Sequence, residues 1–216
     1  MLDIKGVIFD MDGTLTDSMW MWGEVADKYI SEHGGTPRPD LRKVLLSMNT
    51  VEEAQYYIDE YGVDQTLEEV IAGRNAMMME FFSKDVKLKN GVIPILKALR
   101  EHGIKMCLAT ATERELVEPA LKLHGINDYF QRVFCCTEEK TSKTSPDIFI
   151  RAADDMGTEI HETLVVEDAI YAMETAKKAG FIVAGVYDKV ADDHQDEIKA
   201  VCDYYWITLD EMLECL

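Results

Sequence analysis

The chain has 216 residues, 47% of them hydrophobic, which is enough to bury a sizeable core in one large domain or two smaller ones. Its 22 Lys and Arg stand against 41 Asp and Glu, and the formal net charge of −19 argues against nucleic acid or an anionic membrane surface as a standing partner.

The first predicted element is a strand that ends in two acidic residues. Gly6-Val7-Ile8-Phe9 is a continuous apolar run, and Asp10-Met11-Asp12-Gly13-Thr14 follows it. Because side chains alternate along an extended backbone, Asp10 and Asp12 can point to the same side. Two neighbouring carboxylates repel each other and are costly to bury, so the pair predicts a site for a divalent cation.

The segment after this motif is predicted to be entirely helical. Its four helical stretches are Met19–Glu32, Asp40–Met48, Glu52–Tyr61 and Leu67–Phe82. We expect residues 17–85 to form an all-α cap domain, inserted into a core domain of residues 1–16 and 86–216. Ligands of open α/β sheets bind at the carboxyl ends of the strands, so this insertion would cover Asp10 and Asp12 as a lid.

Two features of the predicted cap concern its contacts. Met19-Trp20-Met21-Trp22 opens the first cap helix, and Trp22 is a candidate for substrate contact, the alternative being packing within the cap. Arg74 and Asn75, on the last cap helix, either reach the site or lie at the surface.

After the cap, strands and helices alternate. The apolar runs are Ile104–Ala109, Val133–Cys135, Leu164–Val166 and Ile182–Val186. Continuous apolarity is typical of strands that are covered on both faces, so the core is predicted to be α/β, a Rossmann-like doubly wound parallel sheet. The spacing of a capping box marks several helix starts: Thr50 with Glu53, Thr66 with Glu69, Thr112 with Glu115 and Thr208 with Glu211.

More polar residues follow the predicted strands. Thr110-Ala111-Thr112 ends the second strand, Lys143 precedes Thr144-Ser145-Pro146-Asp147, and Glu167-Asp168 ends the fourth strand. Each has a structural explanation by itself: a helix cap, a solvated loop lysine, and acids at a helix start. Together with Asp10 they fall at one edge of the sheet, and they supply the groups that phosphoryl transfer needs.

In that reaction Asp10 is the candidate nucleophile, because a carboxylate can attack phosphorus without a base and form an aspartyl-phosphate. Mg²⁺ would be held by Asp10, Asp168 and the backbone carbonyl of Asp12. The side chain of Asp12 would protonate the leaving oxygen and then deprotonate water. The remaining phosphate oxygens would be bound by Thr110, Ala111 and Lys143.

With these motifs in order, the chain resembles the haloacid dehalogenase superfamily. It most resembles the helical-cap branch of phosphoglycolate phosphatase and β-phosphoglucomutase-like proteins. Asp10 to Thr14 match the first motif, Thr110 the second, Lys143 with Pro146-Asp147 the third, and Glu167-Asp168 the fourth. The resemblance covers the whole chain and implies a parallel core sheet of five or more strands, Mg²⁺ dependence and the roles given above. It leaves open whether Glu167 touches the metal.

The resemblance also narrows the chemistry. Dehalogenases and phosphonate hydrolases of this superfamily lack the second aspartate, so Asp12 points to phosphate esters. β-Phosphoglucomutases carry a histidine where Trp22 stands and an arginine where Val51 aligns. We therefore expect a phosphatase with a small-molecule phosphate ester as its partner, and a monomer or weak homodimer. A sugar-phosphate mutase and a non-catalytic binding protein are the alternatives.

Other features of the sequence bear on location. No apolar run approaches the length of a membrane span, and no signal-like region precedes the first strand. The cysteines are odd in number and lack metal-ligand spacing, so we expect reduced thiols: Cys107, Cys135, Cys136, Cys202 and Cys215. A cytoplasmic protein without membrane contact is the expectation.

Overall fold

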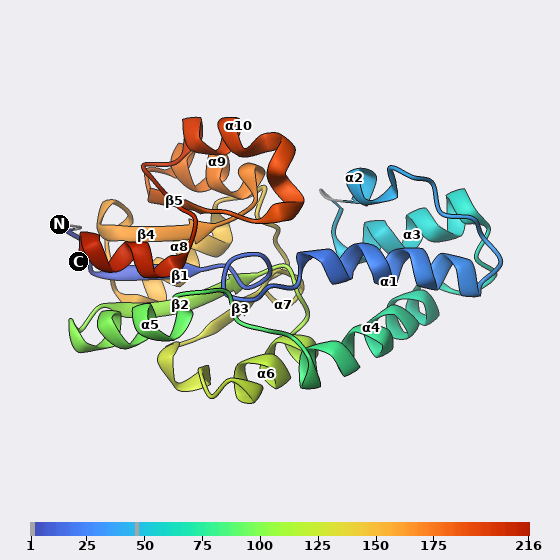
Figure 1. Cartoon of the computed structure of the whole chain (residues 1–216), viewed down its shortest axis with the longest axis horizontal. Coiled ribbons are helices and arrows are strands. Elements are labelled where there is room, and N and C mark those ends of the chain that lie inside the picture. Colours follow the sequence, from blue (N-terminus) through green and yellow to red (C-terminus); the bar gives the residue numbers. More distant parts are fainter. Residues whose placement is uncertain (1–2, 46–47) are drawn as a thin grey trace.

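A computed structural model describes residues 3–45 and 48–216, and its centre is one sheet of parallel strands in the order β3-β2-β1-β4-β5-β6 (Figure 1). The strands are β1 (Gly6–Phe9), β2 (Lys105–Thr110), β3 (Val133–Cys135), β4 (Thr163–Glu167), β5 (Ile182–Val186) and β6 (Tyr204–Trp206). The predicted α/β fold, a Rossmann-like doubly wound parallel sheet, is confirmed. The apolar runs do not predict β6, because this edge strand is only partly buried and short.

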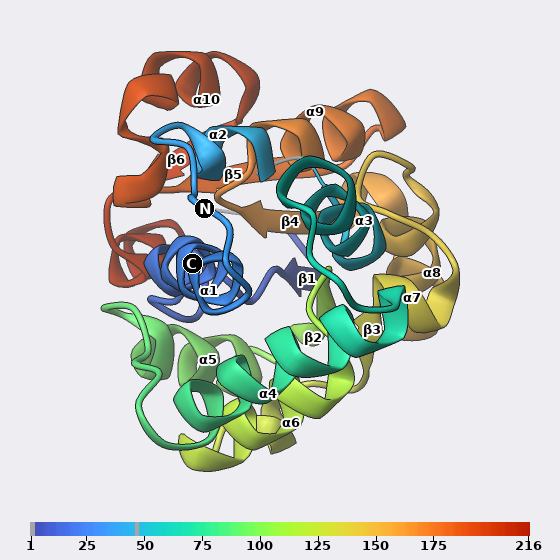
Figure 2. The ribbon, with the colours of Figure 1, turned by 90° about the vertical axis from the view of Figure 1, so that its right-hand side faces the viewer.

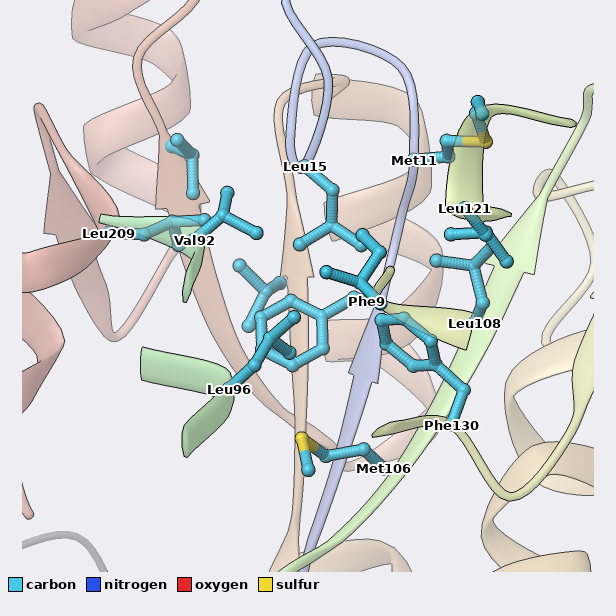
Figure 3. Close-up of a cluster of buried hydrophobic side chains, with 14 of the residues drawn as sticks. Phe9, Met11, Leu15, Val92, Leu96, Met106, Leu108, Leu121, Phe130 and Leu209 are labelled. Atoms are coloured by element: carbon cyan, nitrogen blue, oxygen red, sulfur yellow. The ribbon is translucent and has the colours of Figure 1, made fainter. Parts of the chain in front are cut away.

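Helices cover both faces of the sheet. They are α5 (Val92–Glu101), α6 (Arg114–Leu123), α7 (Cys136–Glu139), α8 (Asp147–Met156), α9 (Ile170–Ala179) and α10 (Gln195–Val201), with 3-10 turns η1 (Asn127–Tyr129), η2 (Ile160–Glu162), η3 (Lys189–His194) and η4 (Leu209–Cys215). Because side chains alternate along β1, Val7 and Phe9 pack with α5 and α6, whereas Ile8 packs with α8, α9 and α10. In the first of these two layers, Phe9 lies between Leu96 and Phe130 (Figure 3).

Between β1 and α5 the chain forms a helical segment of four helices: α1 (Met19–Glu32), α2 (Leu41–Leu45), α3 (Thr50–Tyr61) and α4 (Leu67–Lys84). They lie beyond the ends of the strands, in front of the sheet when seen from their side (Figure 2). The helix predicted over 40–48 corresponds to α2. Residues 46 and 47 of the predicted range lie outside the described part of the chain. A separate cluster around Tyr29 and Tyr57 forms the core of this segment.

The two linkers that join the helical segment to the sheet pair with each other. Thr16 and Leu88 form an antiparallel bridge, and the N–H of Lys89 donates to the carbonyl oxygen of Leu15 over 2.9 Å. The ends of α1 and α4 add apolar contacts, because Phe82 of α4 belongs to the same cluster as Phe9 and Leu15. The segment is therefore tied to the sheet by a short ladder and by shared core.

The predicted capping boxes at Thr66 with Glu69 and at Thr208 with Glu211 are confirmed, at α4 and η4. The prediction for α3 was wrong by one residue. Asn49 is the cap and accepts from the N–H of Glu52, while the Glu52 carboxylate accepts from the N–H of Asn49 over 2.9 Å. Asparagine caps at least as well as threonine, and the shift frees Glu53 for a buried contact of its own.

The structure bears on two of the expectations about location, the lack of a membrane span and the reduced thiols. None of the helices within residues 3–45 and 48–216 is both long and apolar enough to cross a membrane. The cysteines are all free thiols.

The cap of α3 gives a first testable prediction. Asn49→Ala should lower the free energy of unfolding by about 1 kcal/mol, because two N–H groups of the first turn lose their acceptor. Thr50→Ala, one residue later, should stay within about 0.5 kcal/mol of wild type. Urea unfolding followed by circular dichroism measures both, and a larger loss for Thr50→Ala would contradict the assignment.

Candidate active site

The carboxyl ends of three neighbouring strands bring the predicted site residues together. Asp10 follows β1, Thr110 ends β2, and Glu167 and Asp168 end and follow β4. The parallel register aligns these ends, because Phe9 pairs with Leu108 on one side and with Val166 on the other. These four side chains are buried.

Three of the buried acids form a tight cluster. Asp10, Glu167 and Asp168 each offer a carboxylate oxygen within 4.8 Å of the others. Lys143, on the loop before α8, donates its ammonium to both Asp10 and Glu167. Burial raises the pKa of Glu167 to about 7, and burial together with the charge of Asp10 raises the pKa of Asp168. With all three acids ionised, the one ammonium of Lys143 leaves an excess of negative charge in this cluster.

The donor set of the cluster fits a hard divalent cation. Mg²⁺ prefers oxygen ligands and is commonly held by one or two carboxylates. A cation here would offset the repulsion that raises the pKa of Asp168. Glu167 belongs to the cluster, while the side chain of Asp12 does not.

The side chain of Asp12 is held away from the cluster by three donors. The Asp12 carboxylate accepts from the hydroxyl of Ser18 at 2.5 Å, the hydroxyl of Thr112 at 2.6 Å and the indole N–H of Trp22 at 3.2 Å. Burial and the neighbouring charge of Asp10 raise the pKa of Asp12, and these hydrogen bonds only partly oppose the rise. Asp12 is thus a carboxyl group suited to carrying a proton.

The prediction of a capping box at Thr112 with Glu115 was wrong. Helix α6 begins at Arg114, and the carboxylate of Glu115 accepts from the amide of Asn75 over 2.9 Å. The N–H of Thr112 instead donates to the hydroxyl oxygen of Thr110 over 3.0 Å. This bond leaves the hydroxyl proton of Thr110 free to be donated elsewhere.

A cavity of about 150 Å³ lies between the helical segment and this edge of the sheet. All of the predicted site residues line it: Asp10, Asp12, Trp22, Thr110, Ala111, Lys143 and Asp168. The volume is below the 300 Å³ or so at which pockets for drug-sized ligands begin, so the cavity suits a small ligand.

The helical segment contributes a polar wall, of which the sequence offered only Arg74 as a candidate. Glu53 and Arg74 form a buried ion pair with 2.7 Å between Arg74 Nη2 and Glu53 Oε2, and the hydroxyl of Tyr57 donates to Glu53. The guanidinium of Arg74 lies 4.6 Å from the ring centre of Trp22. Trp22 lines the cavity, and its ring also packs 5.8 Å from that of Phe82, while substrate contact by Trp22 stays a prediction.

The sequence left open whether Arg74 and Asn75 reach the site or lie at the surface. Both side chains are buried, and of the two only Arg74 lines this cavity. Arg42 of α2 lines it as well. A charged residue on a short helix carries no local signal of such a role, so sequence reasoning had no means of finding Arg42. For Glu53, the capping-box spacing was a misleading signal.

Comparisons with known proteins agree with this geometry. The profile of the haloacid dehalogenase-like hydrolases matches residues 7–186. The chain is 30% identical to (DL)-glycerol-3-phosphatase 1, mitochondrial, of Arabidopsis thaliana, over 88% of this chain and 66% of that protein. It is 26% identical to the phosphorylated carbohydrates phosphatase of Thermotoga maritima, over 82% of each chain.

Among solved structures, the HAD hydrolase, family IA, variant 3, of Entamoeba histolytica matches with a TM-score of 0.85 and 22% identity, over 96% of this chain and 95% of that one. This likeness extends the agreement in fold to the whole length of the sheet and the helical segment. Because the family profile spans most of the sequence, the resemblance is confirmed: the chain belongs to the haloacid dehalogenase-like hydrolase family.

Proposed function

We propose that this protein is a Mg²⁺-dependent phosphatase that hydrolyses a small phosphorylated metabolite through an aspartyl-phosphate on Asp10. The observation that carries the proposal is the buried Asp10, which shares Lys143 with Glu167 and faces a small cavity. The family and the relatives named as phosphatases support phosphoric monoesters as the substrates.

The proposed reaction has two steps. An oxygen of Asp10 attacks phosphorus, and the bond to the ester oxygen breaks as Asp12 gives that oxygen its proton. Asp12 then takes a proton from water, the water oxygen attacks the aspartyl-phosphate, and free phosphate and the Asp10 carboxylate are restored. The raised pKa of Asp12 and its separation from the acid cluster support this division of roles.

Charge balance supports the proposed binding of phosphate. Mg²⁺, held by Asp10, Asp168 and the backbone carbonyl of Asp12, would supply positive charge at the phosphoryl group. Burial lowers the pKa of Lys143, but the charges of Asp10 and Glu167 outweigh that effect and raise the pKa, so Lys143 stays protonated. Its ammonium, the hydroxyl of Thr110 and the backbone at Ala111 would hold the remaining oxygens.

We further propose that residues 17–85 act as a cap domain over a core of residues 1–16 and 86–216. The paired linkers at Thr16 and Leu88 would be its hinge. The cavity takes part of its wall from this segment, through Trp22 and Arg74 among others. A closed cap would exclude water while the phosphoryl group is transferred.

The nucleophile gives the most direct test. Asp10→Asn should lower kcat/KM for p-nitrophenyl phosphate by about 10³-fold, because the amide does not attack phosphorus. Asp128→Asn, at an exposed position, should behave as wild type. Unchanged circular dichroism would show that both fold, and an active Asp10→Asn protein would sink the proposal.

The two roles of Asp12 predict a distinctive time course. Asp12→Asn should still form the phospho-enzyme from p-nitrophenyl phosphate, whose leaving group needs no proton, but should hydrolyse it about 10²- to 10⁴-fold more slowly. Stopped-flow absorbance should then show a burst of nitrophenolate followed by slow turnover. Glycerol phosphate, whose leaving oxygen does need a proton from Asp12, should give no burst of released glycerol. A variant that turns over as fast as wild type would contradict the assignment.

The metal gives a third test. EDTA should abolish the release of phosphate, and Mg²⁺ should restore it. Without substrate, Mg²⁺ should raise the melting temperature, since saturation at about a hundred times Kd stabilises a protein by about 2.7 kcal/mol. Full activity in EDTA would refute the metal dependence.

Isomerisation of a hexose phosphate without release of free phosphate would instead favour the sugar-phosphate mutase.

A further inference from the structure

A lysine outside the cavity holds the loop that carries Asp12. The ammonium of Lys89 donates to the carbonyl oxygen of Gly13 at 2.7 Å, to the carbonyl oxygen of Tyr187 at 2.6 Å and to the carboxylate of Asp188 at 2.9 Å. An ammonium has three donors, so each of them has an acceptor. The side chains are 14% exposed for Lys89 and 4% for Asp188.

Gly13 is where this contact meets the acid cluster. Its φ of +83° is left-handed, and a Cβ at this position would stand 2.3 Å from Oδ2 of Asp168. The N–H of Gly13 donates to the carbonyl oxygen of Thr16 over 2.8 Å, while its own carbonyl accepts from Lys89. The N–H of Gly13 belongs to the peptide from Asp12 and its carbonyl to the peptide with Thr14, so these two hydrogen bonds hold the peptides on both sides of Gly13.

The place of Lys89 in the fold explains why one side chain can do this. Lys89 lies on the linker that returns from the helical segment, where its N–H donates to the carbonyl of Leu15. Tyr187 and Asp188 follow β5. The lysine thus joins three segments that are far apart in sequence. Asp188 balances its charge, so the pair adds little net charge beside the acid cluster.

We propose that Lys89 is a positioning residue for the cation site. Its hydrogen bond to the Gly13 carbonyl, rather than its charge, holds the loop after β1 against Asp168 and so sets the spacing of the oxygens that would hold Mg²⁺. The inference rests on the proposed Mg²⁺ dependence. Residues that orient metal ligands from behind commonly affect metal affinity about 10- to 100-fold.

A set of variants separates this role from simple stability. Lys89→Met alone would leave Asp188 as a buried unpaired charge, which destabilises a fold whatever the lysine does for the metal. The double variant Lys89→Met/Asp188→Asn removes both charges but still leaves Gly13 without its donor. Asp188→Asn alone removes one charge and keeps the bond to Gly13. Lys5→Met, in an exposed pair with Glu162, is the control.

Calorimetric titration of each folded variant with MgCl₂, without substrate, provides the readout, and thermal melting is measured in parallel. We expect the double variant to melt close to Asp188→Asn, yet to bind Mg²⁺ about 10- to 100-fold more weakly than wild type. Asp188→Asn and Lys5→Met should bind nearly as wild type does.

Three outcomes would overturn the inference. A double variant with wild-type affinity would show that the Gly13 bond does not matter. An equal loss in Asp188→Asn, which can be measured even if the double variant fails to fold, would show that charge sets the affinity. A wild-type protein that binds no Mg²⁺ would instead overturn the proposed function, and the inference with it.

Discussion

The excess of negative charge buried at one edge of the sheet is the constraint on which the rest of this structure depends. Asp10, Glu167 and Asp168 lie together because β1 and β4 are neighbours and run parallel, so their carboxyl ends coincide. Parallel strands covered on both faces cannot move these ends into bulk water. Lys143 offsets only part of the charge, and a bound cation is the simplest way to balance the remainder.

The two aspartates of the first motif differ because their partners differ. The Asp10 carboxylate accepts a hydrogen bond from the ammonium of Lys143. The Asp12 carboxylate accepts hydrogen bonds from two hydroxyls and an indole N–H, all of them neutral donors. Burial raises the pKa of Asp12. In the proposed mechanism these two positions at one strand end would serve as nucleophile and proton carrier, and the contacts that distinguish them come from the helical segment, the loop after β2 and the loop before α8.

The connection between the helical segment and the sheet passes close to this chemistry. Ser18 and Trp22 stand at the start of the segment and bond Asp12, while Lys89 stands at its end and bonds Gly13. The first residues of the helical segment and the linker that follows it therefore both contact the loop after β1. Any movement of the segment as a lid would act on a loop that is held from both sides, and the bridge between Thr16 and Leu88 joins the two linkers beside it.

Much of this architecture follows from local sequence. Apolar runs of strand length mark five of the six strands, and polar residues just after them mark the shared edge, because a parallel sheet gathers strand ends regardless of loop length. The contacts of Glu53, Thr112 and Lys89 carry no such signal. Each is decided by a partner that is at least 21 residues away, Arg74, Asp12 and Gly13 respectively, so only the tertiary structure places the donor beside its acceptor.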